Sequence, residues 1–212
     1  EDVNFLKEIC PGIQAHFLRH PHYQVAKPAK VISFSTPKIK ILIAGQYNLY
    51  MQQDADTMIN CLIKNKELSD LKEHYLYTFL GKGWEHHVNS LNNSGYEAHH
   101  IKFAPDYIEE VCKHDIQITP ICIGTGTKGK VLDAIANGLL VIGSRYALEN
   151  IAVEHNISCL QYNQVEEIVD LLKDICLKSS VYEAMAERGR KAILSQHNNS
   201  FVAGKLFSLF QY

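Results

Sequence analysis

The stretch from Ile116 to Gly143 reads IQITPICIGTGTKGKVLDAIANGLLVIG. An apolar run at Ile116–Thr119 leads into a glycine-rich loop, a short helical pattern and a second apolar run at residues 139–143. Such a loop leaves backbone N–H groups unpaired at a helix start, and Lys128 and Lys130 stand beside them. The stretch therefore predicts an anion site, and phosphate is the expected anion.

The rest of the chain alternates predicted strands with predicted helices. Apolar runs that indicate strands occupy residues 40–45, 74–80, 98–103, 116–119, 139–143 and 157–160. Helical periodicity occupies residues 55–63, 84–91, 107–112, 165–175, 182–194 and 201–210. Because several strand runs are apolar throughout, the strands are expected to be buried on both faces. We therefore predict an α/β fold, with a doubly wound, Rossmann-like parallel sheet and helices on both faces.

The first part of the chain has a different character. Residues 1–9 predict a short amphipathic helix, and residues 13–18 form a weaker strand pattern. Over residues 20–40, prolines and lysines accumulate without helical periodicity, and one short strand is expected at residues 31–34. This composition is typical of a linker or hinge.

Several glycines follow directly after predicted strands. They are Gly45, the pair in Gly81-Lys82-Gly83, and those of residues 124–130. In a doubly wound sheet, ligands bind beyond the carboxyl ends of the strands, where the strand order reverses. We therefore expect these glycine loops to share one edge of the sheet, where a nucleotide would lie.

Composition bounds the class of protein. The 212 residues are 46% hydrophobic and 21% charged with a net charge of −2, which gives no basic field for nucleic acid. No run approaches the roughly 18 apolar residues of a membrane span. The 6 cysteines form no C-x-x-C pair and are expected to be mostly buried free thiols in a reducing cytoplasm. The histidine spacing predicts no metal site.

The glycine loop admits more than one interpretation. Residues 124–130 match G-x-x-x-x-G-K, but Val131 stands where a P-loop has the serine or threonine that binds magnesium. A plain glycine turn with solvated lysines is the simplest alternative.

The spacing of the loop residues resembles a known family. The sequence Pro120-x-x-x-Gly124-x-Gly126-Thr127-x-x-Lys130-x-Leu132-Asp133-Ala134-x-Ala136-x-Gly138-x-x-Val141 is similar to the C-terminal domain of family-four GT-B glycosyltransferases. Other elements resemble the same family in the same order: Gln46-Tyr47-Asn48, Leu80-Gly81-Lys82-Gly83, residues 115–120 and Glu149-Asn150-Ile151. The resemblance covers residues 40–201, which is most of the chain.

The resemblance implies a retaining transferase that uses a nucleotide-diphosphate sugar, with this domain as the donor-binding half and no metal or other cofactor. Lys130 would stabilise the diphosphate leaving group, and Asp133 would accept hydrogen bonds from the ribose hydroxyls. The loop at residues 103–107 would flank the base together with residues 81–83. The full implied donor site is Gly45, Gln46, Gly81, Lys82, Gly124, Thr125, Gly126, Thr127, Lys128, Lys130 and Asp133.

The sequence also departs from the family pattern. Asp133 is one methylene shorter than the family's glutamate, Cys122 replaces a basic residue, and Leu140 replaces a proline. Thr125 stands where the first glutamate of the E-x7-E pattern falls. Cys122, Asp133 and Leu140 leave a rival hypothesis open, a non-catalytic nucleotide- or anion-binding module with a degenerate Rossmann-like fold, whereas Thr125 bears on donor geometry rather than on family membership.

The resemblance also predicts the domain organisation. Residues 1–37 resemble the end of an N-terminal domain plus the hinge, and residues 38–212 resemble the donor-binding domain. We expect the acceptor-binding domain to precede Glu1, any peripheral membrane contact to run through that domain, and this chain alone not to turn over substrate. The family suggests a bacterial, cytoplasmic enzyme of polysaccharide or glycolipid synthesis; base, sugar, acceptor and linkage are not readable.

Some side chains outside the loop invite both a functional and a structural interpretation. Trp84 is expected to pack on the sheet rather than stack on a base, and the pairs at residues 86–87 and 99–100 are expected to be solvated histidines. Arg145 and Glu149 follow a strand, so contact with the donor and a plain surface role are both open. The apolar last helix predicts a contact with the missing domain or with a second copy in a dimer.

Overall fold

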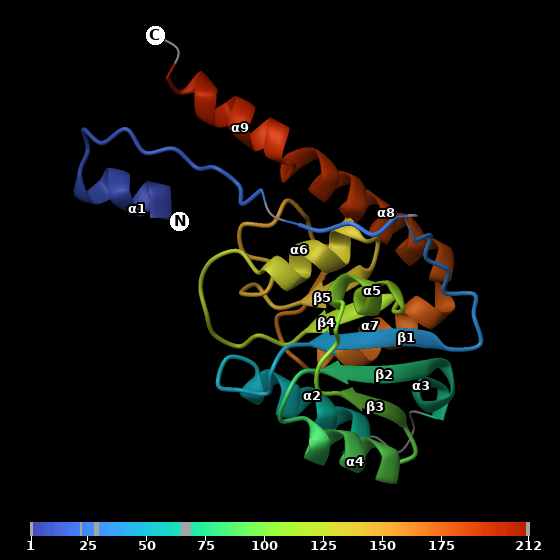
Figure 1. The fold of residues 1–212 in the computed structure, drawn as a ribbon. Coiled ribbons are helices and arrows are strands. Elements are labelled where there is room, and N and C mark those ends of the chain that lie inside the picture. The colour runs from blue at the N-terminus through green and yellow to red at the C-terminus, as the bar shows by residue number, and fades with distance from the viewer. Residues whose placement is uncertain (1, 22, 28–29, 65–68, 211–212) are drawn as a thin grey trace.

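The computed structural model describes residues 2–21, 23–27, 30–64 and 69–210. Its strands are β1 (Ile39–Ala44), β2 (Tyr75–Leu80), β3 (Glu97–Ile101), β4 (Ile116–Thr119), β5 (Leu140–Gly143) and β6 (Leu160–Gln161). Within the described residues they form one 6-stranded sheet of order β3-β2-β1-β4-β5-β6, and every neighbouring pair is parallel (Figure 1). The predicted doubly wound parallel sheet is confirmed.

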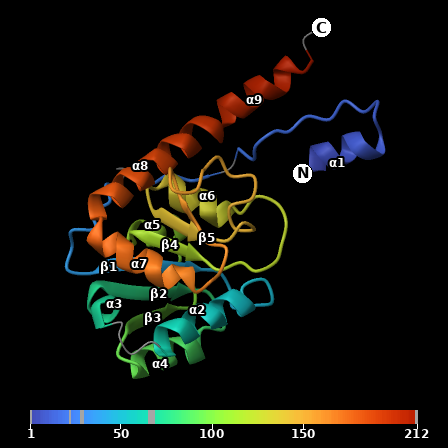
Figure 2. The ribbon, with the colours of Figure 1, turned by 180° about the vertical axis from the view of Figure 1, so that it is seen from behind.

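Helices cover both faces of this sheet. One layer contains α2 (Gln52–Lys64), α4 (Glu85–Asn93) and α7 (Glu167–Leu177), and the other contains α5 (Tyr107–Cys112) and α6 (Gly129–Ala136). The long helix α8 (Ser179–Gln196) adds its first half to one layer and Ile193 to the other. Seen from behind in Figure 2, α7 lies in front of the strands.

Strand β1 shows why the sheet needs two layers of helices. Ile41 and Ile43 pack into the cluster beneath α2 and α7, whereas Leu42 and Ala44 pack into the cluster beneath α6. All four are buried, because successive side chains of a strand point to opposite faces. Each large side chain contributes roughly 1.5–3 kcal/mol by leaving water. The unbroken apolar run of the sequence therefore reflects a central strand that is buried on both sides.

The first 38 residues contain the predicted helix but neither predicted strand. Helix α1 (Asp2–Ile9) forms as expected. Residues 13–18 and 31–34 have no strand partner, so both strand predictions were wrong. Apolar alternation alone does not make a strand where no sheet edge is within reach. The linker instead runs as an extended segment across α6 and along α8, which Figures 1 and 2 both show.

Smaller differences occur near the chain's other elements. Helix α3 (Ser69–His74) was not predicted, and the residues just before it lie outside the described part of the chain. Strand β6 begins at Leu160 rather than at residue 157. The last helix, α9 (Asn199–Ser208), begins where Asn198 Oδ1 accepts a hydrogen bond from the Phe201 N–H at 2.7 Å. Only Cys159 of the six cysteines is fully buried, although all six are free, so most thiols are less buried than we expected.

Candidate functional site

The strand order places a crevice between β1 and β4. The chain leaves β1 toward β2 on one side of the sheet, and β4 continues on the other side, so the order reverses between them. Ile41 pairs with Ile116 and Leu42 with Gln117 across this junction. A cavity of about 740 Å³ opens beyond the carboxyl ends of these two strands. This is the position at which doubly wound sheets bind their ligands.

The cavity is lined by the loops that follow β1 and β4. From the predicted donor site it gathers Gly45, Gln46, Gly124, Thr125, Thr127, Lys128 and Lys130. Asn48, Tyr50, Met51 and Ile123 also line it; Asn48 belongs to a segment that resembles the family, but none of the four was among the predicted donor-site residues. In the sequence, their position just after Gly45 or just before Gly124 is what indicates that they could line the cavity.

Backbone contacts join the two loops. The Cys122 N–H donates to the Tyr50 carbonyl at 2.9 Å, and Cys122 Sγ lies 3.2 Å from the same oxygen. Ser144, which follows β5, donates its hydroxyl to the Ile121 carbonyl at 2.5 Å. Cys122, a departure from the family pattern, thus connects the β1 loop to the glycine loop.

The glycine loop leads directly into the N-terminus of α6. Gly126 has φ +77°, in the left-handed region that favours glycine. The N-cap residue of this helix, Lys128, makes no side-chain capping bond. The first N–H groups of a helix have no carbonyl partner inside the helix, and the helix dipole adds partial positive charge. The start of α6 therefore offers unpaired donors to an anion in the cavity.

A buried polar side chain in β4 supports this helix start. Gln117 is fully buried in the centre of the sheet, and its Nε2 donates to Thr119 Oγ1 at 3.0 Å and to the Lys130 carbonyl at 3.4 Å. A buried amide costs free energy unless it is hydrogen-bonded. Gln117 therefore connects β4 to the first turn of α6, and a glutamine within an apolar strand was the sequence signal for it.

The two lysines of the loop have different surroundings. Lys128 Nζ donates to the carbonyls of Thr125 at 3.0 Å and Gly126 at 2.5 Å, and it lies 3.8 Å from Glu149 Oε2. Desolvation lowers the pKa of Lys128, and the charge of Glu149 acts in the opposite direction. Most of the hydrogen-bonding capacity of this ammonium is therefore used within the loop.

Lys130 has no ion-pair partner among the described residues. Its Nζ lies 5.6 Å from the centre of the Tyr107 ring, a cation–π contact, and burial lowers the pKa of the ammonium. The residue as a whole is exposed. An incoming anion can therefore pair with Lys130 without displacing a carboxylate, whereas Lys128 already lies near Glu149.

The loop after β2 lies behind the cavity rather than in its lining. A Cβ on Gly81 would lie 2.2 Å from the Gly45 carbonyl oxygen, so the β1 and β2 loops are in direct contact at the edge of the sheet that we expected them to share. The Lys82 carbonyl accepts the Tyr47 N–H at 2.9 Å. Among the described residues, Gly81, Lys82 and Gly126 are not part of the cavity wall. Their predicted donor contacts stay predictions.

Aromatic side chains fix the β1 loop from the same side. Trp84 is fully buried and donates its indole N–H to the Gly45 carbonyl at 2.8 Å, so the prediction that it packs on the sheet is confirmed. His87 Nε2 lies 2.8 Å from Asp56 Oδ1, and the Tyr47 hydroxyl donates to the same carboxylate. Together these contacts hold the loop that begins at Gly45.

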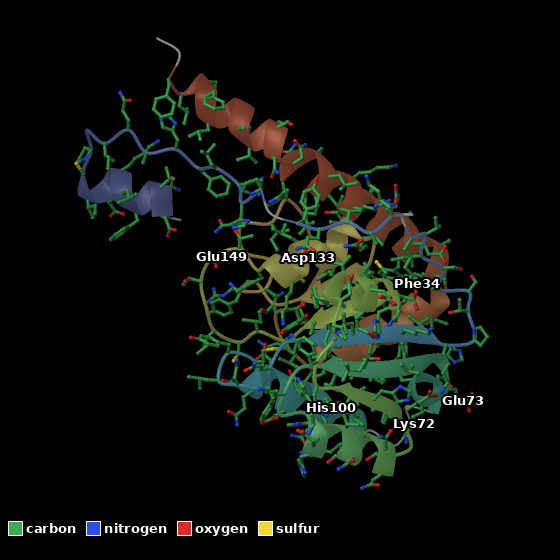
Figure 3. The ribbon with its side chains drawn as sticks, viewed as in Figure 1. Phe34, Lys72, Glu73, His100, Asp133 and Glu149 are labelled. Carbon is green, nitrogen blue, oxygen red and sulfur yellow. The ribbon has the colours of Figure 1, made fainter. Side chains whose placement is uncertain are left out.

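The prediction of solvated histidine pairs was half wrong. His86 and His99 are exposed, but His87 is buried against Asp56, and His100 Nε2 lies 2.7 Å from the Gly81 carbonyl. Figure 3 shows His100 beside the strands of this edge. In each pair, one histidine is exposed to solvent and its neighbour packs against the protein.

Asp133 lies on α6 and points to the linker rather than to the cavity wall. Its Oδ1 accepts the Gln24 N–H at 2.8 Å, and the residue is buried (Figure 3). Its charge also contributes, after burial, to raising the pKa of Tyr107. The predicted ribose contact of Asp133 stays a prediction, and any ribose would compete with this existing partner.

A second cavity of about 630 Å³ adjoins the glycine loop. Gly124 and Thr125 line it on one side, Arg145 and Glu149 on another, and residues 2–4 of α1 on a third. Buried Glu149 Oε2 accepts no hydrogen bond from the described residues. Arg145 and Glu149, whose roles were open, thus lie next to the predicted phosphate loop.

Two classes of feature are absent from the described residues. No group of three or more His, Cys, Asp or Glu side chains is arranged to hold a metal ion within them. No helix in the same part of the chain combines the length and apolar character needed to cross a membrane. The prediction that the site uses no metal is not tested by this finding.

Comparison with solved structures shows similar folds at low identity. Anabaena HepE in complex with UDP has a TM-score of 0.65 and 10% identity, over 82% of this chain and 49% of that one. The C-terminal domain of the group 1 glycosyl transferase LpcC from Francisella tularensis has a TM-score of 0.61 and 14% identity, over 77% of this chain and 88% of that one. WaaG, a glycosyltransferase involved in lipopolysaccharide biosynthesis, has a TM-score of 0.61 and 18% identity, over 81% and 47%.

The chain spans about half the length of HepE and WaaG, whereas it matches most of the isolated LpcC domain. A sequence comparison with curated proteins gives no match. The family described as glycosyl transferase-like matches residues 64–208, which covers most of the sheet and the helices after it. The parallel sheet, the loop at its switch point and this match lead to one conclusion: the chain belongs to the glycosyl transferase-like family.

Proposed function

We propose that this chain is the donor-binding domain of a retaining glycosyltransferase that uses a nucleotide-diphosphate sugar. The cavity between β1 and β4 holds the diphosphate against residues 124–130. The observation that carries this proposal is the uncapped start of α6 beside Lys130, a lysine without an ion-pair partner among the described residues. The likeness to HepE, a protein solved with UDP and with UDP-glucose, supports the same ligand class.

The chemistry of transfer fits these groups. Transfer breaks the bond between the anomeric carbon and a β-phosphate oxygen, and it joins that carbon to an acceptor oxygen that loses its proton. Negative charge accumulates on the departing diphosphate. Fixed N–H donors and an ammonium at that position stabilise the transition state more than the ground state. Lys130 is the group that we assign to this role.

The acceptor would bind to a second domain, which faces this edge of the sheet. The coverage of about half of HepE and WaaG supports that arrangement. The role of WaaG in lipopolysaccharide biosynthesis supports polysaccharide or glycolipid synthesis as the wider process. We propose that this process is bacterial and cytoplasmic. We propose a hexosyl group as the transferred sugar, and we expect this chain alone to bind a donor without transferring it.

Thermal unfolding with a panel of nucleotides tests the proposal. UDP, GDP and ADP are each added to the chain, with the matching nucleosides as controls that lack phosphate. A diphosphate at a hundredfold over its Kd adds about 2.7 kcal/mol of stability, whereas its nucleoside adds much less. No stabilisation by any diphosphate would refute the donor site. Binding that persists in a full-length protein unable to transfer sugar would favour the non-catalytic module.

A further inference from the structure

The linker is bound to the side of α6 that carries Asp133 and Asn137. Asp133 Oδ1 accepts the Gln24 N–H at 2.8 Å, and Asn137 Oδ1 accepts the Ala26 N–H at 2.9 Å. Asn137 Nδ2 donates in return to the Gln24 carbonyl at 2.7 Å and to the Asp133 carbonyl at 2.8 Å. Two side chains therefore satisfy three polar groups of the linker backbone, the N–H and C=O of Gln24 and the N–H of Ala26.

The geometry of this contact follows from the spacing of the residues. Positions 133 and 137 are four apart on a helix, which separates them by about 6 Å along the axis. Gln24 and Ala26 are two apart in an extended chain, which separates their N–H groups by about 6.6 Å. The spacing of the two side chains therefore matches the spacing of the two backbone N–H groups. Asp133 and Asn137 accept hydrogen bonds from the linker as the carbonyls of a neighbouring strand would. Both residues are buried, at 9% and 2% exposure.

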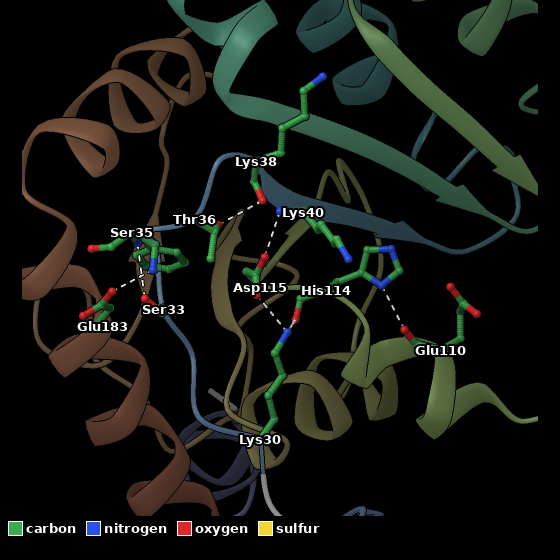
Figure 4. Close-up of polar contacts among 11 residues, drawn as sticks. Lys30, Ser33, Ser35, Thr36, Lys38, Lys40, Glu110, His114, Asp115 and Glu183 are labelled. Carbon is green, nitrogen blue, oxygen red and sulfur yellow. Dashed lines mark hydrogen bonds and ion pairs between the residues drawn. The ribbon is translucent and has the colours of Figure 1, made fainter.

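Other contacts hold the linker on either side of this point. His197 Nδ1 lies 2.7 Å from the His20 carbonyl, and Lys30 Nζ forms an ion pair with Asp115 at 2.8 Å. Further along, the Phe34 N–H donates to Glu183 Oε1 at 2.6 Å. Figure 4 shows the contact between Lys30 and Asp115. The described linker is therefore seated along the domain rather than free.

We propose that Asp133 and Asn137 form a linker clamp, and that Asp133 is a positioning residue rather than the ribose ligand which the resemblance implies. The clamp uses the helix whose first turn carries Lys130, so one rigid element holds both the linker and the phosphate loop. The clamp itself does not depend on the proposed function. Only the statement that ribose is bound without Asp133 rests on it.

Amide hydrogen exchange at Gln24 and Ala26 tests the clamp without any ligand. Asn137→Ala and Asp133→Ala each remove one acceptor, so exchange at these two amides should rise at least tenfold in both variants. Asp133→Asn keeps an oxygen at the acceptor position, so it should restore the protection of Gln24. The same protection in Asp133→Ala or Asn137→Ala as in the natural chain would overturn the proposal. If Asp133→Ala does not fold, the other two variants still decide the question.

Titration with UDP separates the clamp from a ribose contact. The clamp predicts that Asp133→Asn and Asn137→Ala change UDP affinity equally, by less than threefold. A tenfold loss in Asp133→Asn alone would make Asp133 a ribose ligand and overturn the assignment. If the natural chain does not bind UDP, the titration counts against the proposed donor, and the exchange experiment alone decides the clamp.

Discussion

The ammonium of Lys128 lies 3.8 Å from Oε2 of Glu149, and Lys128 lines one of the two cavities beside the glycine loop whereas Glu149 lines the other. The same ammonium donates to the carbonyls of Thr125 and Gly126. Lys128 therefore shapes the loop, whereas Lys130 is left to meet an anion.

Lys128→Ala should weaken nucleoside diphosphate binding only about two- to threefold, which corresponds to less than about 0.7 kcal/mol. The lysine already interacts with three oxygens of the protein, so little of its charge is new to the ligand. Calorimetric titration measures the change. A tenfold loss would mean that Lys128 leaves these partners when the ligand binds.

Glu149→Gln should strengthen diphosphate binding severalfold at low salt. The substitution removes a carboxylate that repels the ligand and attracts Lys128. The gain should shrink as salt is added, because salt screens the repulsion between this half-buried carboxylate and the incoming ligand. Glu187→Gln is the matched control, because Glu187 pairs with Lys191 on α8 and does not line either cavity. Equal effects of both substitutions would show that only net charge matters.

Gly81→Ala should destabilise the domain by about 3 kcal/mol or more. The new Cβ would lie 2.2 Å from the Gly45 carbonyl oxygen, and Gly81 has φ +135°, where alanine is strained. Gly12→Ala is the control, because a Cβ there meets no heavy atom within 4 Å. Denaturant unfolding compares the two. Similar stabilities of both variants would contradict the close contact between the β1 and β2 loops.

The stability of the chain should fall as the pH drops below about 6.5, in part through His197. Its Nε2 accepts the Ala152 N–H at 3.0 Å and its Nδ1 lies 2.7 Å from the His20 carbonyl, so the ring is held neutral. Burial lowers the pKa of His197, and the positive charge of Arg19 adds to this effect.

The sign follows from proton linkage. Between the folded and the unfolded pKa of His197, the unfolded chain binds more protons than the folded chain does. The contribution of His197 to the free energy of unfolding is therefore fully present above about pH 6.5 and is lost as the pH falls. Burial also lowers the pKa of His114, which contributes in the same direction. Urea unfolding at several pH values measures the slope, and His197→Gln should reduce it. An unchanged slope in that variant would assign the pH dependence to other groups.

Periodicity predicted the sheet because its central strands are apolar on both faces, as in Ile41 to Ala44. It failed at residues 13–18 and 31–34, where apolar residues also recur but the segment pairs with no strand of the sheet. Pairing is a long-range property, so local sequence does not decide it. Contacts between distant segments therefore decide whether such a segment becomes a strand.

The same limit applies to the site. Glycine spacing located the phosphate loop, and strand order placed Gly45 beside it. Nothing local in the sequence told that Asp133 meets Gln24, which lies 109 positions away. The split of the histidine pairs into exposed and buried members also depends on the packing of α4 and β3 against their neighbours.

The central claim is that residues 124–130 bind the diphosphate of a nucleotide sugar. Calorimetric titration of UDP into the natural chain, Lys130→Ala and Lys191→Ala tests it most directly, because Lys191 lies on α8, pairs with Glu187 and lines neither cavity beside the loop. We predict that Lys130→Ala loses at least tenfold in affinity, about 1.4 kcal/mol, and that Lys191→Ala binds as the natural chain does. UDP binding that is equally strong in all three proteins would contradict it.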